Sequence, residues 1–367
     1  MAGCLLVALV LVDAFNTLVL ARRTRHVFRI ARVYYQATWR PFSALTRKIQ
    51  SPLTRESVLG IYGPMSLLLL IVLWGVGLVF SFAFLEWSVG MKTPSLTPTF
   101  THDLYLSSRA LVTLSDGDPE NAASQFLSVC EGGLGLAFLG LVVGYLPILY
   151  QSFATRELVI SLLDARAGSP PSAGGLLAST PFETDGVIQN LERWESWMAQ
   201  ILENQISFPM LGYFRSQHSN QAWLTALVAF VDYATIISIV SQGSLRLQAE
   251  MTAAMGRHVL SDVVVIFGRE HSCERKPSCR LSGHADQFRG LLLARPGMFD
   301  VNRLSDEIIT EKSTEYEPEA AALSFYFLMS LPGAVPDQAV RNDWRVGIMN
   351  RDEAPFAVSD PFKDPEP

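Results

Sequence analysis

The sequence predicts an all-α membrane protein with three transmembrane helices, a re-entrant pore helix and loop, and a helical cytoplasmic domain. The mean hydropathy of +0.23 is positive and only 17% of the residues are charged, which is typical of a chain with a membrane-embedded part. Apolar residues are concentrated in positions 1 to 150, and the rest of the chain has dispersed charges and helical periodicity.

The first apolar segment, residues 3 to 20, would span about 27 Å as a helix, close to the ~30 Å thickness of the hydrocarbon layer. A cleaved signal peptide is the alternative, but no basic residue precedes the segment and three arginines follow it within residues 22 to 25. Asp13 and Asn16 share one face of this helix, and contacts to neighbouring helices explain them more simply than an ion site.

The second apolar segment, residues 61 to 87, ends on Trp87, which is placed as an interfacial anchor. The third segment, residues 125 to 150, contains the glycine-rich stretch EGGLGLAFLGLVVGYLP. Small residues allow membrane helices to approach closely, which is the simpler reason for these glycines. A gating hinge at Gly135 or Gly140 is the alternative.

The charge distribution predicts the orientation of these segments. Residues 21 to 60 contain nine arginines and lysines against one acid, Glu56, so the positive-inside rule makes this loop cytoplasmic. The expected location is the cell membrane (plasma or inner), with the N-terminus outside and everything after Tyr150 cytoplasmic. Within the basic loop, VFRIARVYYQATW predicts a helix on the lipid surface, and attraction to anionic headgroups explains it without a specific lipid.

Residues 88 to 124 then face outside. The stretch KTPSLTPTF suits an irregular turret, and THDLYLSSRALVT predicts a helix of about ten residues with Thr101 or Asp103 as its N-cap. Such a helix is too short to cross a bilayer. A short helix, the polar stretch LVTLSDGDPE and a membrane helix, in that order, predict a re-entrant segment that lines a pore or resembles one. An ordinary outer loop with an Asp-Gly turn is the alternative.

This order of elements resembles the two-transmembrane pore-loop module of potassium channels, whose filter reads T-V-G-Y-G-D. More closely, the chain resembles bacterial members of the potassium channel family that carry an extra N-terminal helix and a cytoplasmic helical domain. The stretches that carry this resemblance are GIYGPMSLLLL (60–70), GYLPILYQSF (144–153), SLLDARAGSPPSAGGLL (161–177) and YFRSQHSNQAWLTAL (213–227). The pore-loop module itself matches residues 61 to 153.

The resemblance implies a selectivity filter formed by Thr113, Leu114, Ser115, Asp116, Gly117 and Asp118. Two positions depart from the family pattern. Ser115 replaces the first glycine, and its Cβ resists the positive φ that glycine accepts. Asp116 replaces the aromatic residue. Because each chain has one pore loop, a closed ring requires a homotetramer, and four Asp116 carboxylates would favour cations, including divalent ones.

The expected function is therefore a cation channel subunit with altered or weak potassium selectivity. Potassium-selective conduction is one alternative, and a non-conducting signalling or scaffold protein that retains the pore-loop fold is another. Arg109, one turn before the filter, and Glu131, early in the third segment, are expected to support the filter. A snorkelling role at the outer interface is the alternative for Arg109.

The predicted domains are an N-terminal helix with a basic linker (1–60), the pore-loop module (61–153), a linker (154–180), a cytoplasmic helical domain (181–345) and a disordered tail (346–367). The segment ISLLDARAGSPPSAGG predicts a helix that ends at Gly168. Residues 222 to 241 are apolar enough to cross a membrane, but polar residues recur on one face and favour a buried helix of a bundle.

The cytoplasmic part offers weaker signals. His271, Cys273, Cys279 and His284 suggest zinc, but the gap between the cysteines is long for a structural zinc site, so a basic surface loop is preferred. YFRSQHSNQAW concentrates Arg215, His218, Asn220 and Trp223, which suggests an unknown cytoplasmic ligand or a subunit contact; capping and packing explain it nearly as well. No basic footprint indicates nucleic acid, and no catalytic motif, cofactor motif or metal site is expected.

Overall fold

The computed structural model describes residues 1–18, 30–89, 99–112, 122–216, 221–268, 279–294 and 297–336. Within these ranges the regular structure is helical and contains no strand, which confirms the all-α class. The chain divides into two compact units, the first formed by residues 1–156 and 200–219 and the second by residues 157–199 and 220–367. Residues 200–219 thus belong with the N-terminal part, although the sequence suggested a single boundary near residue 153.

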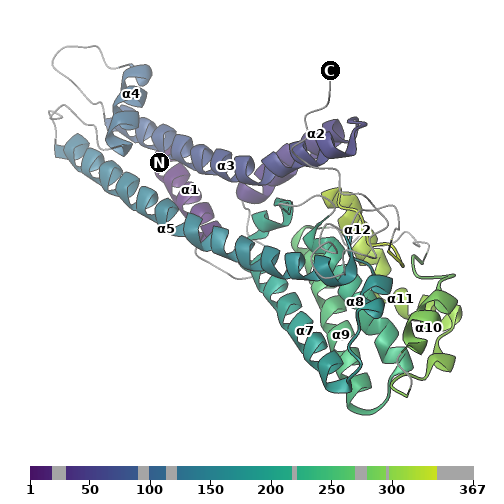
Figure 1. Ribbon diagram of the computed structural model, residues 1–367. Helices are drawn as coiled ribbons and strands as arrows, with labels where there is room; N and C mark the ends of the chain where they lie inside the picture. Colours follow the sequence, from purple (N-terminus) through teal and green to yellow (C-terminus); the bar gives the residue numbers. More distant parts are fainter. Residues whose placement is uncertain are drawn as a thin grey trace, which may run out of the picture. The chain divides into compact units, whose positions relative to one another are not determined.

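The first unit contains α1 (Ala2–Leu18), α2 (Ile30–Thr46), α3 (Pro52–Val89), α4 (Phe100–Leu111), most of α5 (Ala122–Ala167), the end of α7 (Thr184–Ser207) and η1 (Pro209–Tyr213). Helix α1 packs along α3 in the antiparallel direction (Figure 1). A Cβ on Gly3 would lie 2.8 Å from the carbonyl oxygen of Ser81, and a Cβ on Gly77 would lie 3.0 Å from Val10 Cγ2. Small residues on both helices therefore permit their close approach.

Asp13 is buried where α1, α2 and α3 meet. Its carboxylate accepts a hydrogen bond from the indole Nε1 of Trp74 (2.9 Å) and another from the backbone nitrogen of Ala31 (3.1 Å). Ala31 is the second residue of α2, and the first amides of a helix have no partner within the helix. Asp13 thus accepts hydrogen bonds from the N-terminus of α2 and from the indole of Trp74 in α3. Contacts to neighbouring helices are what the sequence predicted for this residue.

The aromatic residues of α2 pack against protein. Tyr35 and Trp39 are buried, and the Tyr35 ring stacks on that of Tyr213 in η1, with 5.2 Å between ring centroids. Trp39 packs against Tyr62 of α3 at 4.8 Å. The sequence pattern suggested a helix on the lipid surface, yet these two rings lie in the core of the first unit. The sequence did not reveal this because Tyr213 is far away along the chain.

Three of the described helices are long and apolar enough to cross a membrane, namely α3, α5 and α8. They support a membrane protein, but they are not the same three that the sequence suggested. The segment predicted first, residues 3 to 20, is described to Leu18 and forms a shorter apolar helix, α1. Every residue of α8 is buried within the second unit, which is the packing expected of a bundle helix.

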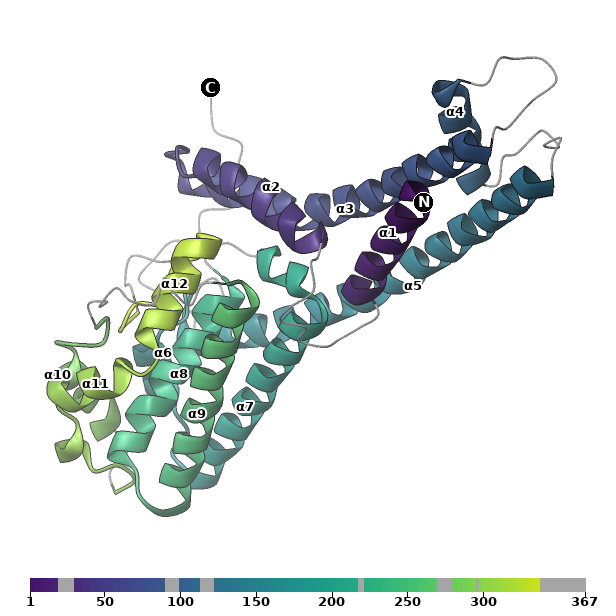
Figure 2. The same ribbon diagram turned by 180° about the vertical axis from the view of Figure 1, so that it is seen from behind.

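The second unit contains α6 (Ala173–Ala178), most of α7, α8 (Trp223–Val240), α9 (Gly243–Ile266), α10 (Ala285–Leu293), η3 (Val301–Arg303), α11 (Asp306–Ser313) and α12 (Glu317–Phe327). Helices α7, α8 and α9 lie side by side, with α8 enclosed by its neighbours (Figure 2). A Cβ on Gly256 of α9 would lie 2.2 Å from Val231 Cγ2, so glycine is needed where α9 crosses α8. The predicted linker 154–180 is largely helical, because α5 continues to Ala167 and α6 follows.

A buried ion-pair network ties α8 to later segments of the second unit. Arg280 Nη1 and Nη2 donate to the two carboxylate oxygens of Asp232 at 3.1 and 3.0 Å, and the Tyr316 hydroxyl donates to the same carboxylate at 2.6 Å. The backbone nitrogen of Arg280 donates to Glu317 at 2.8 Å. Burial alone would lower the pKa of Arg280, but the charge of Asp232 and the hydrogen bonds to it raise that pKa above its ordinary value.

Candidate functional site

Helix α4 packs against the end of α3 and is inclined to it (Figure 1). Near its start, the Phe100 ring contacts that of Phe84, with 5.0 Å between centroids. Two turns later, Ser107 Oγ donates a hydrogen bond to the carbonyl oxygen of Val79 at 2.9 Å. The order of contacts along α4 is opposite to the order along α3, so the two helices are antiparallel. With twelve residues, α4 is about 18 Å long and too short to span a bilayer.

The last turn of α4 lies against two glycines of α5. A Cβ on Gly135 would lie 1.9 Å from the carbonyl oxygen of Leu111, and a Cβ on Gly132 would lie 3.5 Å from that of Ala110. Gly135 comes thirteen residues after Ala122, or about 20 Å along α5. The carbonyl end of α4, which carries partial negative charge, therefore lies well inside the apolar length of α5.

Three buried carboxyl groups lie where α4 packs against α3 and α5. Glu86 of α3, Asp103 of α4 and Glu131 of α5 each have 0% of their surface exposed. Glu86 is close enough to interact electrostatically with both of the others. Within the described part of the chain, neither oxygen of Glu86 or of Asp103 has a hydrogen-bond partner, and no arginine or lysine forms an ion pair with the three acids. His102, next to Asp103 in α4, acts on that carboxyl group electrostatically. Buried carboxyl groups in this situation either take up a proton or acquire a cationic partner.

Ser107 of α4 contacts both long helices, α3 through the Val79 carbonyl and α5 through Glu131. Its hydroxyl contacts Glu131 Oε1 through a short hydrogen bond in addition to its contact with the Val79 carbonyl. Glu131 thus contacts α4, and its role as a support of the filter stays a prediction. No three acidic, histidine or cysteine side chains within the described ranges lie in a geometry that could hold a metal ion.

Glu86 and Asp103 were missed as site residues by the sequence reasoning. Asp103 was considered only as an N-cap, but α4 begins at Phe100 with Thr99 in the N-cap position, and Asp103 lies buried in the first turn. The sequence did contain a signal for Glu86. An acid within a long apolar segment is costly unless it faces protein, water or a partner, and Glu86 is the acid nearest to the end of α3.

The predicted filter, Thr113, Leu114, Ser115, Asp116, Gly117 and Asp118, lies outside the described residues, which end at Val112 and resume at Ala122. Arg109 is half-buried on α4, with its guanidinium 5.6 Å from the centroid of the Tyr105 ring. Gly140 differs from Gly135 because a Cβ there would meet nothing within 4 Å.

The other predicted residues are divided between the two units. His271, Cys273, His218 and Asn220 lie outside the described residues, as does the predicted tail 346–367. Cys279 is a free thiol, and His284 directly precedes α10. Arg215 is buried in the first unit, 3.6 Å from Glu56, whereas Trp223 begins α8 in the second unit. Burial lowers the pKa of Arg215, partly opposed by the charge of Glu56.

Comparison of the chain with protein-family models, with curated proteins and with solved structures gave no significant match. The geometry around α4 therefore carries the functional argument.

Proposed function

We propose that the chain is a subunit of a homotetrameric cation channel of the pore-loop type, with altered or weak selectivity for potassium. Residues 113 to 118, which follow α4 directly, are the proposed filter. The observation that carries the proposal is the position of α4. This helix packs against α3 and ends where the carbonyl oxygen of Leu111 contacts Gly135 of α5. A short helix that stops inside the apolar length of its neighbour is what a re-entrant segment requires.

The direction of α4 suits a cation pathway. A helix carries about half a negative charge at its C-terminal end, and this end of α4 is followed by a segment with two aspartates, Asp116 and Asp118. Carbonyl oxygens and carboxylates are the groups that form cation-selective filters. In the proposed tetramer, four copies of Asp116 form a ring that attracts monovalent and divalent cations, while Ser115 weakens the carbonyl ladder on which potassium selectivity depends.

The packing of the two long helices favours assembly. Only 11% of the most apolar window of α5 is buried in one chain, compared with 39% for α3. Apolar side chains such as Leu136, Leu139 and Val143 remain exposed along α5. Apolar surface of this extent requires lipid or other subunits. The antiparallel packing of α1 on α3 also supports an N-terminus on the side where α3 ends, which is the outside in the proposed topology, with the second unit in the cytoplasm.

Reconstitution of the purified full-length chain in planar bilayers tests this proposal. We expect cation currents under potassium and sodium gradients, with a calcium dependence that changes in Asp116→Asn. Glu120→Gln removes another acid from the same outer segment and serves as the matched control, with conductance close to that of the unmodified chain. Protein that is tetrameric by light scattering yet carries no current in any gradient would favour the non-conducting signalling or scaffold protein instead.

A further inference from the structure

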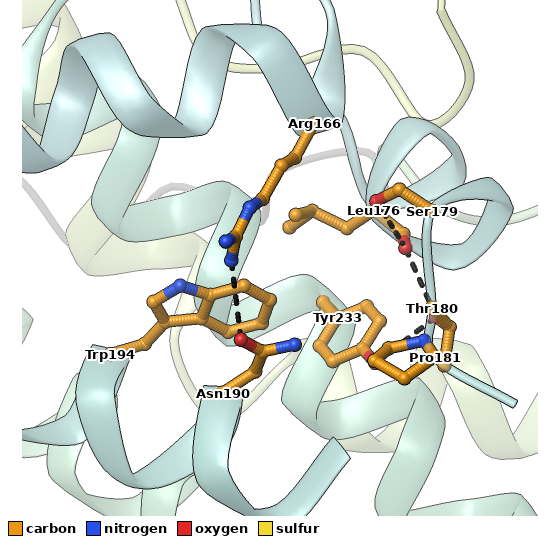
Figure 3. A pocket seen from close by; sticks show the side chains of 8 residues that line it. All are labelled: Arg166, Leu176, Ser179, Thr180, Pro181, Asn190, Trp194 and Tyr233. Atoms are coloured by element: carbon orange, nitrogen blue, oxygen red, sulfur yellow. Dashed lines mark hydrogen bonds between the residues drawn. The ribbon is translucent and has the colours of Figure 1, made fainter. Parts of the chain in front are cut away.

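A cavity of about 250 Å³ lies within the second unit, where α5, α6, α7 and α8 meet (Figure 3). Arg166 reaches into it from the end of α5, and Asn190 and Trp194 line it from α7. Tyr233 of α8 and Thr180, which follows α6, form the opposite side. None of these residues belongs to the proposed pore-loop module, so the cavity is independent of the proposed channel function.

The local sequence constructs this cavity by turning the chain sharply after α5. Gly168 has a φ of +88°, a conformation that favours glycine and ends the helix after Ala167. Ser172 then caps α6 by accepting a hydrogen bond from the nitrogen of Gly175 at 3.1 Å. A Cβ on Gly175 would lie 2.0 Å from the carbonyl oxygen of Ala167. Glycine therefore allows α6 to pack directly on the end of α5, which places Arg166 across from Thr180.

The mouth of the cavity is polar and carries a positive charge. Arg166 Nη1 donates a hydrogen bond to Asn190 Oδ1 at 3.2 Å, which leaves the Asn190 amide nitrogen as a further donor. Among the described residues no carboxylate pairs with Arg166. An arginine presents several N–H donors in one plane, a geometry that matches a carboxylate.

The floor of the cavity is aromatic and rigid. Trp194 is 5% exposed and Tyr233 is 1% exposed. The Trp194 ring stacks on Phe230 with 4.4 Å between centroids and meets Tyr233 edge-on at 5.2 Å. The Tyr233 hydroxyl is also fixed, because it lies 3.1 Å from the hydroxyl of Thr180. Rings held in this way offer two preformed apolar walls, set at 81° to one another, to a small ligand.

We propose that this cavity binds a small aromatic carboxylate, with the carboxylate on Arg166 and Asn190 and the ring against Trp194 and Tyr233. Its volume lies below the ~300 to 1,000 Å³ typical of sites for drug-sized ligands, so a ligand with one ring fits better than a nucleotide. The apolar walls formed by Trp194 and Tyr233 favour a carboxylate that carries a ring over inorganic phosphate, which offers only the negative charge.

Isothermal titration of the full-length protein in detergent with benzoate tests the proposal, with benzamide and inorganic phosphate as comparison probes. We expect saturable benzoate binding at one site per chain, with benzamide and phosphate each weaker by about tenfold or more, because each lacks either the charge or the ring. Absence of saturable benzoate binding would overturn the proposal. Phosphate affinity equal to that of benzoate would overturn the aromatic assignment.

Arg166→Gln is the decisive variant, since Arg166 is exposed and its loss should leave the fold intact. Its benzoate affinity should fall by about 10- to 100-fold, the usual range for loss of a charge-assisted hydrogen bond. Arg193→Gln is the matched control, because Arg193 is an exposed arginine of α7 next to Trp194 that does not line the cavity. Unchanged melting temperatures would show that both variants fold. Equal affinity in the two variants would contradict the assigned site.

Discussion

The backbone of Gly135 lies directly against the carbonyl oxygen of Leu111, so closely that a Cβ at residue 135 would be 1.9 Å from that oxygen. This contact fixes the last turn of α4 to α5. The oxygen belongs to the backbone of a helix and cannot rotate away as a flexible side chain can. Any larger residue at position 135 must therefore move α4.

Gly135→Ala should lower the stability of the protein and, in the bilayer assay of the proposed channel, abolish or alter the current. We expect a loss of about 1 to 3 kcal/mol, the range for overpacking of a tight contact, measured by thermal unfolding in detergent. Gly140→Ala is the control, because a Cβ there meets nothing within 4 Å. It should stabilise the helix by about 0.5 to 1 kcal/mol, since alanine suits a helix interior better than glycine. A Gly135→Ala protein as stable as Gly140→Ala would contradict the close contact.

Ser107 and Glu131 should behave as a coupled pair. Ser107→Ala and Glu131→Ala each remove one partner from a buried hydrogen bond and should destabilise the protein by about 1 to 3 kcal/mol. The double variant should cost less than the sum of the two, with a coupling energy of about 0.5 kcal/mol or more in a cycle of thermal unfolding measurements. Strict additivity would show that the two side chains do not interact.

Asp13 should prove structural and have no part in ion transport. Asp13→Asn retains an oxygen that can accept from Trp74 and from the Ala31 nitrogen, so folding and single-channel conductance should stay close to those of the unmodified chain. Asp13→Leu leaves both buried donors without a partner and should cost about 2 kcal/mol or more. A change in conductance in Asp13→Asn, with unchanged unfolding temperature, would instead place Asp13 on the ion pathway.

Arg280 should be among the most sensitive positions of the second unit. Arg280→Met leaves Asp232 as a buried charge without its cation and should cost about 3 to 5 kcal/mol in chemical unfolding. Arg257 offers a matched comparison, since its ion pair with Glu315 at 3.2 Å lies at the surface. Arg257→Met should cost no more than about 1 kcal/mol. Similar losses in both variants would argue against a buried network.

Local sequence patterns were sufficient for the helices themselves. The glycine after Ala167 ended α5 as predicted, and the apolar run of residues 222 to 241 formed the buried helix that its polar face suggested. The short helix between the second and third apolar segments was also expected, and α4 confirms it. These features depend on interactions between near neighbours along the chain, which a sequence displays directly.

Contacts between distant residues could not be predicted in the same way. Three features can be predicted only when it is known which faces of separate helices pack together. They are the contact of Leu111 with Gly135, the cluster of buried acids Glu86, Asp103 and Glu131, and the cavity beside Arg166. A periodic pattern shows that a helix has a buried face, but many partners satisfy the same pattern.

Residue patterns alone were enough to predict a helical protein with apolar helices suited to a membrane, and a short helix before a polar segment between two of them. The contact of α4 with Gly135 and the burial of two unexpected acids, Glu86 in α3 and Asp103 in α4, emerged only from the packing of the helices. The physical reason is that helix formation is governed by residues a few positions apart, whereas burial and close packing depend on side chains brought together from across the chain.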